Sequence, residues 1–208
     1  AARRSVLLSV SAFADAPDPY SGQIIAANYG SANLPPNLGP LVCPEAPGRD
    51  GLPVHFETEV TGPVHPEDFV VRGAGGDVRP VLCATFFPSD DPGDRRSILL
   101  VGEFGDAEDQ PASVEVVGNL WSTDLNRSYQ GASSDMIPLE ATPSMILAEV
   151  VPEEEWALDA PGTPVPWGGG TGCPSEGTRQ VLRVAWSGGV RAVGGAEVTE
   201  QEWQHYTV

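Results

Sequence analysis

The stretch "VHFETEVTGPVHPEDFVVRGAGGDVRPVLCATFF", residues 54–87, decides the fold class. Residues 54–60 alternate between apolar and polar side chains, which is typical of a half-buried strand. A short apolar run follows at 67–72, then a glycine-rich turn at 73–77 and a longer strand-like run at 78–87. The pattern predicts successive strands joined by turns.

Strand-like runs separated by turn signals continue on both sides of this stretch. "SILLVGEF" (97–104) is nearly all apolar and predicts a central strand, and "ASVEVVGNL" (112–120) alternates again. "GQIIAANYG" (22–30) predicts another short strand upstream. Short strands spaced by turn signals indicate an all-β fold, and we expect an antiparallel β-sandwich with at most short helices. The 24 glycines and 21 prolines agree with many turns.

The middle of the chain resembles the Ig-like modules of bacterial secreted and surface-layer proteins. The matching positions are Pro63-Val64-His65-Pro66, Phe69 and the later pair Gly118-Asn119, within residues 52–135. The resemblance implies a seven-strand Ig-like sandwich with a scaffolding role and no catalytic residues.

The chain is expected to divide into two parts. We expect residues 1–135 to form the sandwich and residues 136–208 to add β-rich strands to it, as a second domain or as part of one single domain. "RQVLRVAWSGGVRAVGG" (179–195) predicts a hairpin. "RRSVLLSVSAFADAPDP" (3–19) has features of a signal peptide, but its alternation favours a first strand of a mature chain.

Charge and cysteine content limit the partners. The 29 acidic residues against 11 arginines give a net charge of −18, which argues against nucleic acid, and no apolar run is long enough for a membrane span. Three cysteines and the composition suggest a secreted or periplasmic protein. We expect a disulfide between Cys43 and Cys83, with Cys173 free or paired outside this sequence.

The acidic turns suggest calcium as the one cofactor to consider; otherwise we expect none. Asp90, Asp91 and Asp94 cluster in one turn, and Asp106 and Asp109 cluster in another. Calcium prefers several carboxylate and carbonyl oxygens, although these spacings are not those of an EF-hand, and solvated surface acids are the simpler interpretation.

The aromatic residues suggest a ligand site. All five tryptophans lie at or after residue 121. Tryptophans in loops can stack on sugars or wall an apolar pocket, while those in strands belong to a core. Only if His205 and Glu202 approach the tryptophans do they form an acid–base pair. The candidate ligand-binding residues are Trp121, Tyr129, Trp186, Trp203 and His205.

Three functions remain open. The first is a secreted, non-catalytic module that binds a small molecule, a carbohydrate or a partner protein. The second is a cofactor-independent enzyme of small-molecule biosynthesis, of the cyclase or pericyclase kind, which would use an aromatic-lined pocket. The third is a calcium-stabilised adhesion module. An enclosed pocket walled by these aromatic residues, with an Asp, Arg or His inside, would favour a ligand-handling enzyme or a carrier.

Overall fold

The chain folds as an all-β protein, as the sequence predicts. A computed structural model describes residues 20–31, 33–34, 43–89, 93–159, 172–190, 199 and 204–205. This part of the chain contains ten strands and two short 3-10 segments, η2 (Pro66–Asp68) and η3 (Glu153–Glu155). The strand predicted within residues 3–19 lies outside the described residues. No helix in the described ranges is long and apolar enough to cross a membrane.

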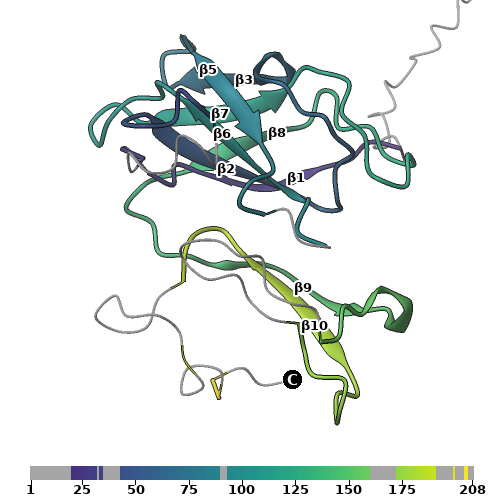
Figure 1. The fold of residues 1–208 in the computed structure, drawn as a ribbon. Coiled ribbons are helices and arrows are strands. Elements are labelled where there is room, and N and C mark those ends of the chain that lie inside the picture. Colours follow the sequence, from purple (N-terminus) through teal and green to yellow (C-terminus); the bar gives the residue numbers. More distant parts are fainter. Residues whose placement is uncertain are drawn as a thin grey trace, which may run out of the picture.

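Eight strands form one large sheet (Figure 1). Their order across the sheet is β4-β3-β7-β8-β1-β2-β6-β5. The strands are β1 (Ile24–Asn28), β2 (Asp50–Phe56), β3 (Phe69–Gly73), β4 (Val78–Arg79), β5 (Val81–Thr85), β6 (Ser97–Gly102), β7 (Pro111–Val116) and β8 (Ser133–Ile137).

The large sheet is nearly closed into a barrel. Its first and last strands, β4 and β5, are separated in the chain by Pro80 alone. Proline has no backbone N–H and interrupts a strand ladder, so the predicted run at 78–87 divides there. The first half pairs with β3 and the second with β6. An Ig-like sandwich of two sheets is therefore not confirmed.

The sheet is also mixed, and not antiparallel throughout as predicted. Strands β1 and β8 run parallel, with Ala27 opposite Met136, while the other pairs in the large sheet are antiparallel. Strand β8 extends to Ile137 and so crosses the expected boundary at residue 135. The division into 1–135 and 136–208 stays a prediction.

The core lies inside the large sheet. Alternate residues of its strands, among them Val54, Val71 and Leu100, are completely buried there. The Tyr129 ring packs edge-on against Phe56, with 4.7 Å between the ring centres. Burial of these side chains is the main source of stability for the sheet.

A second, two-stranded sheet lies beside the first. Strands β9 (Met145–Val151) and β10 (Val181–Trp186) pair antiparallel, and we call them the β9–β10 sheet. Figure 1 shows it beneath the large sheet, on the side of β1 and β2. The hairpin predicted within 179–195 differs from this, because β10 pairs with β9; residues 191–195 lie outside the described ranges.

Candidate functional site

The predicted aromatic site does not form around Tyr129. This side chain is fully buried in the core, and its hydroxyl is 2.6 Å from Thr58 Oγ1. Burial raises the pKa of the Tyr129 hydroxyl, and the nearby Glu57 carboxylate adds to this, while its bond to Thr58 acts the other way. The prediction of a ligand-contacting Tyr129 is not supported by this placement, because the ring serves core packing.

The described tryptophan candidates, Trp121 and Trp186, belong to different parts of the fold. Trp121 follows β7 in the large sheet, and its Nε1 donates to Asn119 Oδ1 at 2.8 Å. Trp186 ends β10 in the β9–β10 sheet. His205 is exposed, and Trp203 lies outside the described residues. Their role in binding stays a prediction.

The acids of the predicted calcium turns have other partners. Asp106 Oδ1 accepts hydrogen bonds from the backbone N–H of Glu108 and Asp109, at 3.0 and 2.9 Å. Both carboxylate oxygens of Asp109 accept from Arg79 Nη2 at 2.8 Å, and this bond lowers the pKa of Asp109. In the part of the chain that the structure covers, no three His, Cys, Asp or Glu side chains form a metal-binding group.

The remaining predicted ligands add little to a calcium site. Asp94 lies in the turn before β6, where its backbone carbonyl accepts from the Ser97 N–H at 3.0 Å. Asp90 and Asp91 lie outside the described ranges. Calcium binding stays a prediction.

The predicted disulfide is wrong. Cys43, Cys83 and Cys173 are free thiols, and no pair lies at bonding distance. Cys43 and Cys83 pack against the same small cluster, Leu34, Ala46 and Val101. Burial, with the neighbouring Cys43 thiol, raises the pKa of Cys83 to about 12. The two thiols therefore contribute to side-chain packing and form no covalent bridge.

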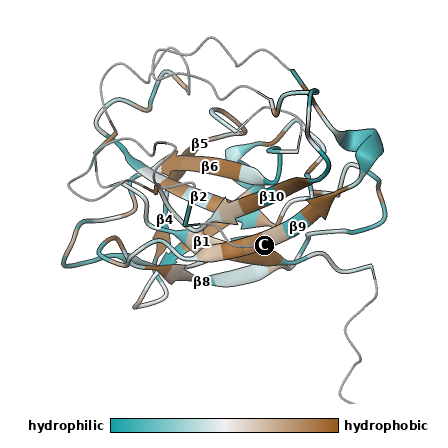
Figure 2. Cartoon of the chain, turned by 90° about the horizontal axis from the view of Figure 1, so that it is seen from below, coloured by the Kyte–Doolittle hydropathy of each residue, from teal (hydrophilic) through white to brown (hydrophobic). Residues whose placement is uncertain are grey.

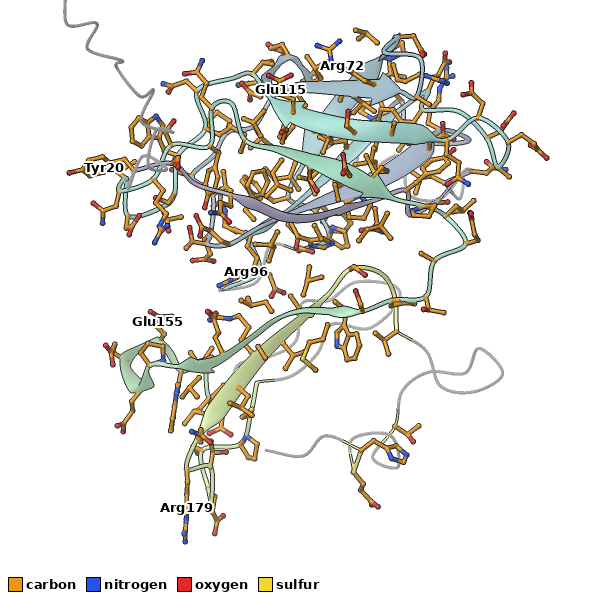
Figure 3. All side chains as sticks on the ribbon, turned by 180° about the vertical axis from the view of Figure 1, so that it is seen from behind. Tyr20, Arg72, Arg96, Glu115, Glu155 and Arg179 are labelled. Atoms are coloured by element: carbon orange, nitrogen blue, oxygen red, sulfur yellow. The ribbon has the colours of Figure 1, made fainter. Side chains whose placement is uncertain are left out.

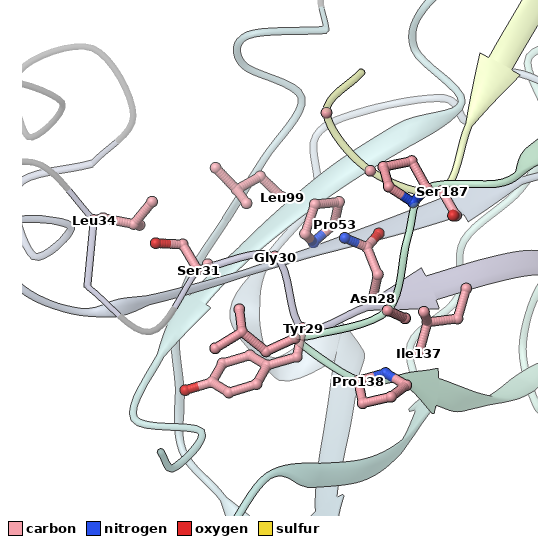
Figure 4. Close-up of a pocket in the computed structure, with 16 residues that line it drawn as sticks. Asn28, Tyr29, Gly30, Ser31, Leu34, Pro53, Leu99, Ile137, Pro138 and Ser187 are labelled. Carbon is pink, nitrogen blue, oxygen red and sulfur yellow. The ribbon is translucent and has the colours of Figure 1, made fainter. Parts of the chain in front are cut away.

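The site that the fold builds instead is a pocket between the two sheets (Figure 4). Its volume is about 410 Å³. One wall comes from β1, β2 and β6 of the large sheet, including Asn28, Pro53 and Leu99. The opposite wall contains Pro143, before β9, and Gly188, just after β10. None of the sixteen described lining residues is charged.

Asn28 is the notable polar residue in this pocket. It ends β1, where Ala27 faces the core and the next side chain must face the opposite way. Asn28 is only 7% exposed, yet its Oδ1 has no hydrogen-bond partner among the described residues. In Figure 4 its side chain points toward Pro53 and Ser187. A buried acceptor without a partner is costly and needs an explanation.

Glycines leave room in front of this amide. A Cβ built on Gly188 would lie 3.8 Å from Asn28 Nδ2, and one built on Gly30 would lie 3.3 Å from the same atom. Larger residues at either position would bring side-chain atoms against the amide. The two glycines thus keep one edge of Asn28 open toward the pocket.

The other polar groups of the pocket are already engaged. Ser187 Oγ accepts from the Ser144 N–H at 3.0 Å, and Tyr29 donates its hydroxyl to the carbonyl of Gly105 at 2.8 Å. Burial and the carboxylate of Asp50 raise the pKa of Tyr29 to about 12. Tyr29 therefore stays protonated at neutral pH and presents no charge to the pocket.

A histidine–serine pair lies on the same outer face of the large sheet as Pro53. His55 Nδ1 is 2.8 Å from Ser97 Oγ, across the β2–β6 ladder. Burial lowers the pKa of His55 to about 4, and its Nε2 has no partner in the described ranges. With 8% of its surface exposed and neither residue lining the pocket, the pair is poorly placed for chemistry on a ligand there.

An ionic cluster holds the β9–β10 sheet beside this face. Arg96 Nη2 donates to Glu149 Oε1 at 3.0 Å, and Arg183 Nη1 donates to the same oxygen at 2.6 Å. Figure 3 shows Arg96 at the junction of the two sheets. Because Arg96 is buried and also donates to the carbonyls of Gly93 and Glu57, its position is fixed.

Comparisons with known proteins do not identify a family for this chain. No family model matches the chain, and no curated protein and no solved structure matches it. The resemblance to Ig-like modules therefore stays a prediction.

Proposed function

We propose that this protein is a non-catalytic binding module that takes an uncharged, mainly apolar ligand in the pocket between the large sheet and the β9–β10 sheet. The observation that carries the proposal is the uncharged lining of a partly enclosed pocket of about 410 Å³, a volume within the usual range for small-molecule sites. A single buried amide, Asn28, supplies the polar contact.

The lining argues for an uncharged ligand. Leu99, Pro53 and Pro143 offer apolar surface, and no described lining residue can pair with an ionised group. An ion would lose its hydration on entry without gaining a partner. The net charge of −18 disfavours anions further.

Binding is better supported than turnover. Tyr129 is in the core, the His55–Ser97 pair does not line the cavity, and the acid–base candidate His205 is not among the described lining residues. A carbohydrate is the less favoured ligand, because the described lining residues offer no exposed aromatic platform and few free polar groups. A secreted or periplasmic location, without nucleic acid or membrane as partner, remains part of the proposal.

The test is a titration with Nile red, an uncharged apolar dye whose fluorescence rises on leaving water. We expect binding to the wild type and at least about tenfold weaker binding to Gly188→Leu, whose Cβ fits in ordinary contact with Pro143 and Asn28 and whose longer side chain occupies the cavity. Gly75→Leu, in the β3–β4 turn, is the matched control, since its Cβ meets only Asp77 Oδ1, at 3.4 Å.

A second control separates the pocket from exposed apolar surface. Val150 and Leu182 are register partners on the outer face of the β9–β10 sheet, 58% and 40% exposed. Figure 2 shows most of both strands of this sheet in the brown of hydrophobic residues. The double variant Val150→Thr/Leu182→Thr should bind dye as the wild type does. If it loses binding while Gly188→Leu retains it, the proposal is wrong.

A further inference from the structure

Asn28 combines burial with an unfilled hydrogen-bonding capacity. Its amide carries an acceptor, Oδ1, and a two-proton donor, Nδ2, side by side in one plane. The acceptor is shut off from solvent and has no partner among the described residues, while the donor faces the gap left by Gly30 and Gly188. The surrounding wall is uncharged and more apolar than polar, and a hydrogen bond in such a partly enclosed site is stronger than in water.

We propose that Asn28 makes the pocket selective for ligands that contain a cis amide, such as lactams, cyclic dipeptides and other cyclic imides or ureas. The inference deepens the proposed function and rests on it. A cis amide presents its N–H and C=O on the same edge, so that it can donate to Oδ1 and accept from Nδ2 in one paired contact. Satisfying both atoms removes the cost of the unpartnered acceptor.

The paired contact needs an adjustment of Asn28. The last torsion of an asparagine side chain is broad, and the inference requires a turn about it that brings Oδ1 to the opening that Nδ2 already faces. A half turn exchanges the two atoms, and the paired contact with a cis amide is the same in either orientation.

The same geometry discriminates against ordinary peptides. Linear peptide bonds are almost always trans and present N–H and C=O on opposite edges. A trans amide can therefore satisfy one atom of Asn28 but not both. Within an otherwise uncharged pocket, this leaves ring-constrained amides as the matching class.

The test compares two probes that differ in one hydrogen-bond donor. The bicyclic lactam 3,4-dihydro-2(1H)-quinolinone is titrated into the full chain, alongside its N-methyl derivative. We expect the lactam to shift the Asn28 side-chain NH₂ signal in a ¹H–¹⁵N spectrum, assigned by its loss in Asn28→Leu. The N-methyl compound should bind at least about tenfold more weakly, because it leaves Oδ1 unpaired.

The outcomes separate this inference from the proposed function. Equal affinity for the two probes, or no binding of the lactam to a protein that binds Nile red in the pocket, overturns the cis-amide inference and leaves the proposed function standing. If Nile red binding is also insensitive to Gly188→Leu, the proposed function fails as well. The comparison of probes on the wild type does not depend on whether Asn28→Leu folds.

Discussion

Arg96 and Glu149 join the two sheets: Arg96 Nη2, in the turn before β6, lies 3.0 Å from Glu149 Oε1 at the middle of β9. The Arg96 side chain is 8% exposed, and that of Glu149 is 34% exposed. Arg183 binds the same carboxylate from β10. The pair therefore fixes the β9–β10 sheet over the face that also carries the pocket wall.

Loss of Arg96 should loosen that arrangement. Arg96→Leu removes three hydrogen bonds and leaves Glu149 with Arg183 alone, so we expect the free energy of unfolding to fall by about 1–3 kcal/mol. Urea denaturation measures this change.

Arg72→Leu is the control, because its pair with Glu115 spans 3.9 Å and both side chains are about two-fifths exposed. Figure 3 labels both residues. That variant should change stability by less than about 1 kcal/mol. Equal effects of the two substitutions would contradict the account.

The buried His55 should make stability depend on pH. Burial lowers its folded-state pKa to about 4 from an ordinary value of 6.5, so the unfolded chain takes up the proton first as pH falls. The stabilising effect of keeping His55 neutral is complete above pH 6.5 and is lost as pH falls from about 6.5 to 4. The loss can reach about 3 kcal/mol. Urea denaturation at several pH values measures this loss, and His55→Gln should weaken the dependence of the free energy of unfolding on pH in this interval. If that dependence is unchanged in the variant, another group is responsible.

Tyr129 should matter for stability and not for binding. Tyr129→Phe keeps the ring against Phe56 but removes the buried hydroxyl that bonds Thr58, and we expect a loss of about 1–2 kcal/mol. Thr58→Val is the companion variant, and the double variant should lose less than the sum because both changes remove one shared bond. Nile red affinity should stay at the wild-type value in Tyr129→Phe. A large drop in affinity with little change in stability would restore Tyr129 as a ligand contact.

The cysteines should react as three free thiols of unequal reactivity. Cys173 is exposed, whereas burial raises the pKa of Cys83 and leaves little thiolate at pH 8. Iodoacetamide without reductant should therefore modify Cys173 quickly and Cys83 slowly, as measured by mass spectrometry of digested protein. Recovery of a Cys43–Cys83-linked peptide from unreduced native protein would contradict the free-thiol assignment.

Local sequence patterns predicted the strands that carry strong apolar signals. Strand β6 matches the apolar run "SILLVGEF", β3 matches the short apolar run at 67–72, and β7 matches the alternating segment at 112–120, because each strand buries side chains in the core. Strand β8, with the sequence "SSDMI", was missed because it offers no such pattern. Its parallel pairing with β1, and the division of 78–87 at Pro80, depend on contacts distant in the chain.

The pocket could not be predicted for the same reason. An asparagine at the end of "IIAAN" carries no signal of function by itself. Asn28 becomes part of a pocket only because Gly188, 160 positions later in the sequence, lies next to its amide, and the sequence marks Gly188 only as a turn residue. The tryptophans predicted a ligand site because indole rings in loops can stack on sugars or wall an apolar pocket, yet none of those in the described ranges lines the cavity.

If the cavity between the two sheets is the binding site, Nile red titrated into the full chain should perturb the backbone ¹H–¹⁵N signals of the residues around it. The largest shifts should fall on Gly30, Ser31, Gly188 and Gly189, which line the cavity. Largest shifts at Val150 and Leu182, on the exposed face of the β9–β10 sheet, would contradict it.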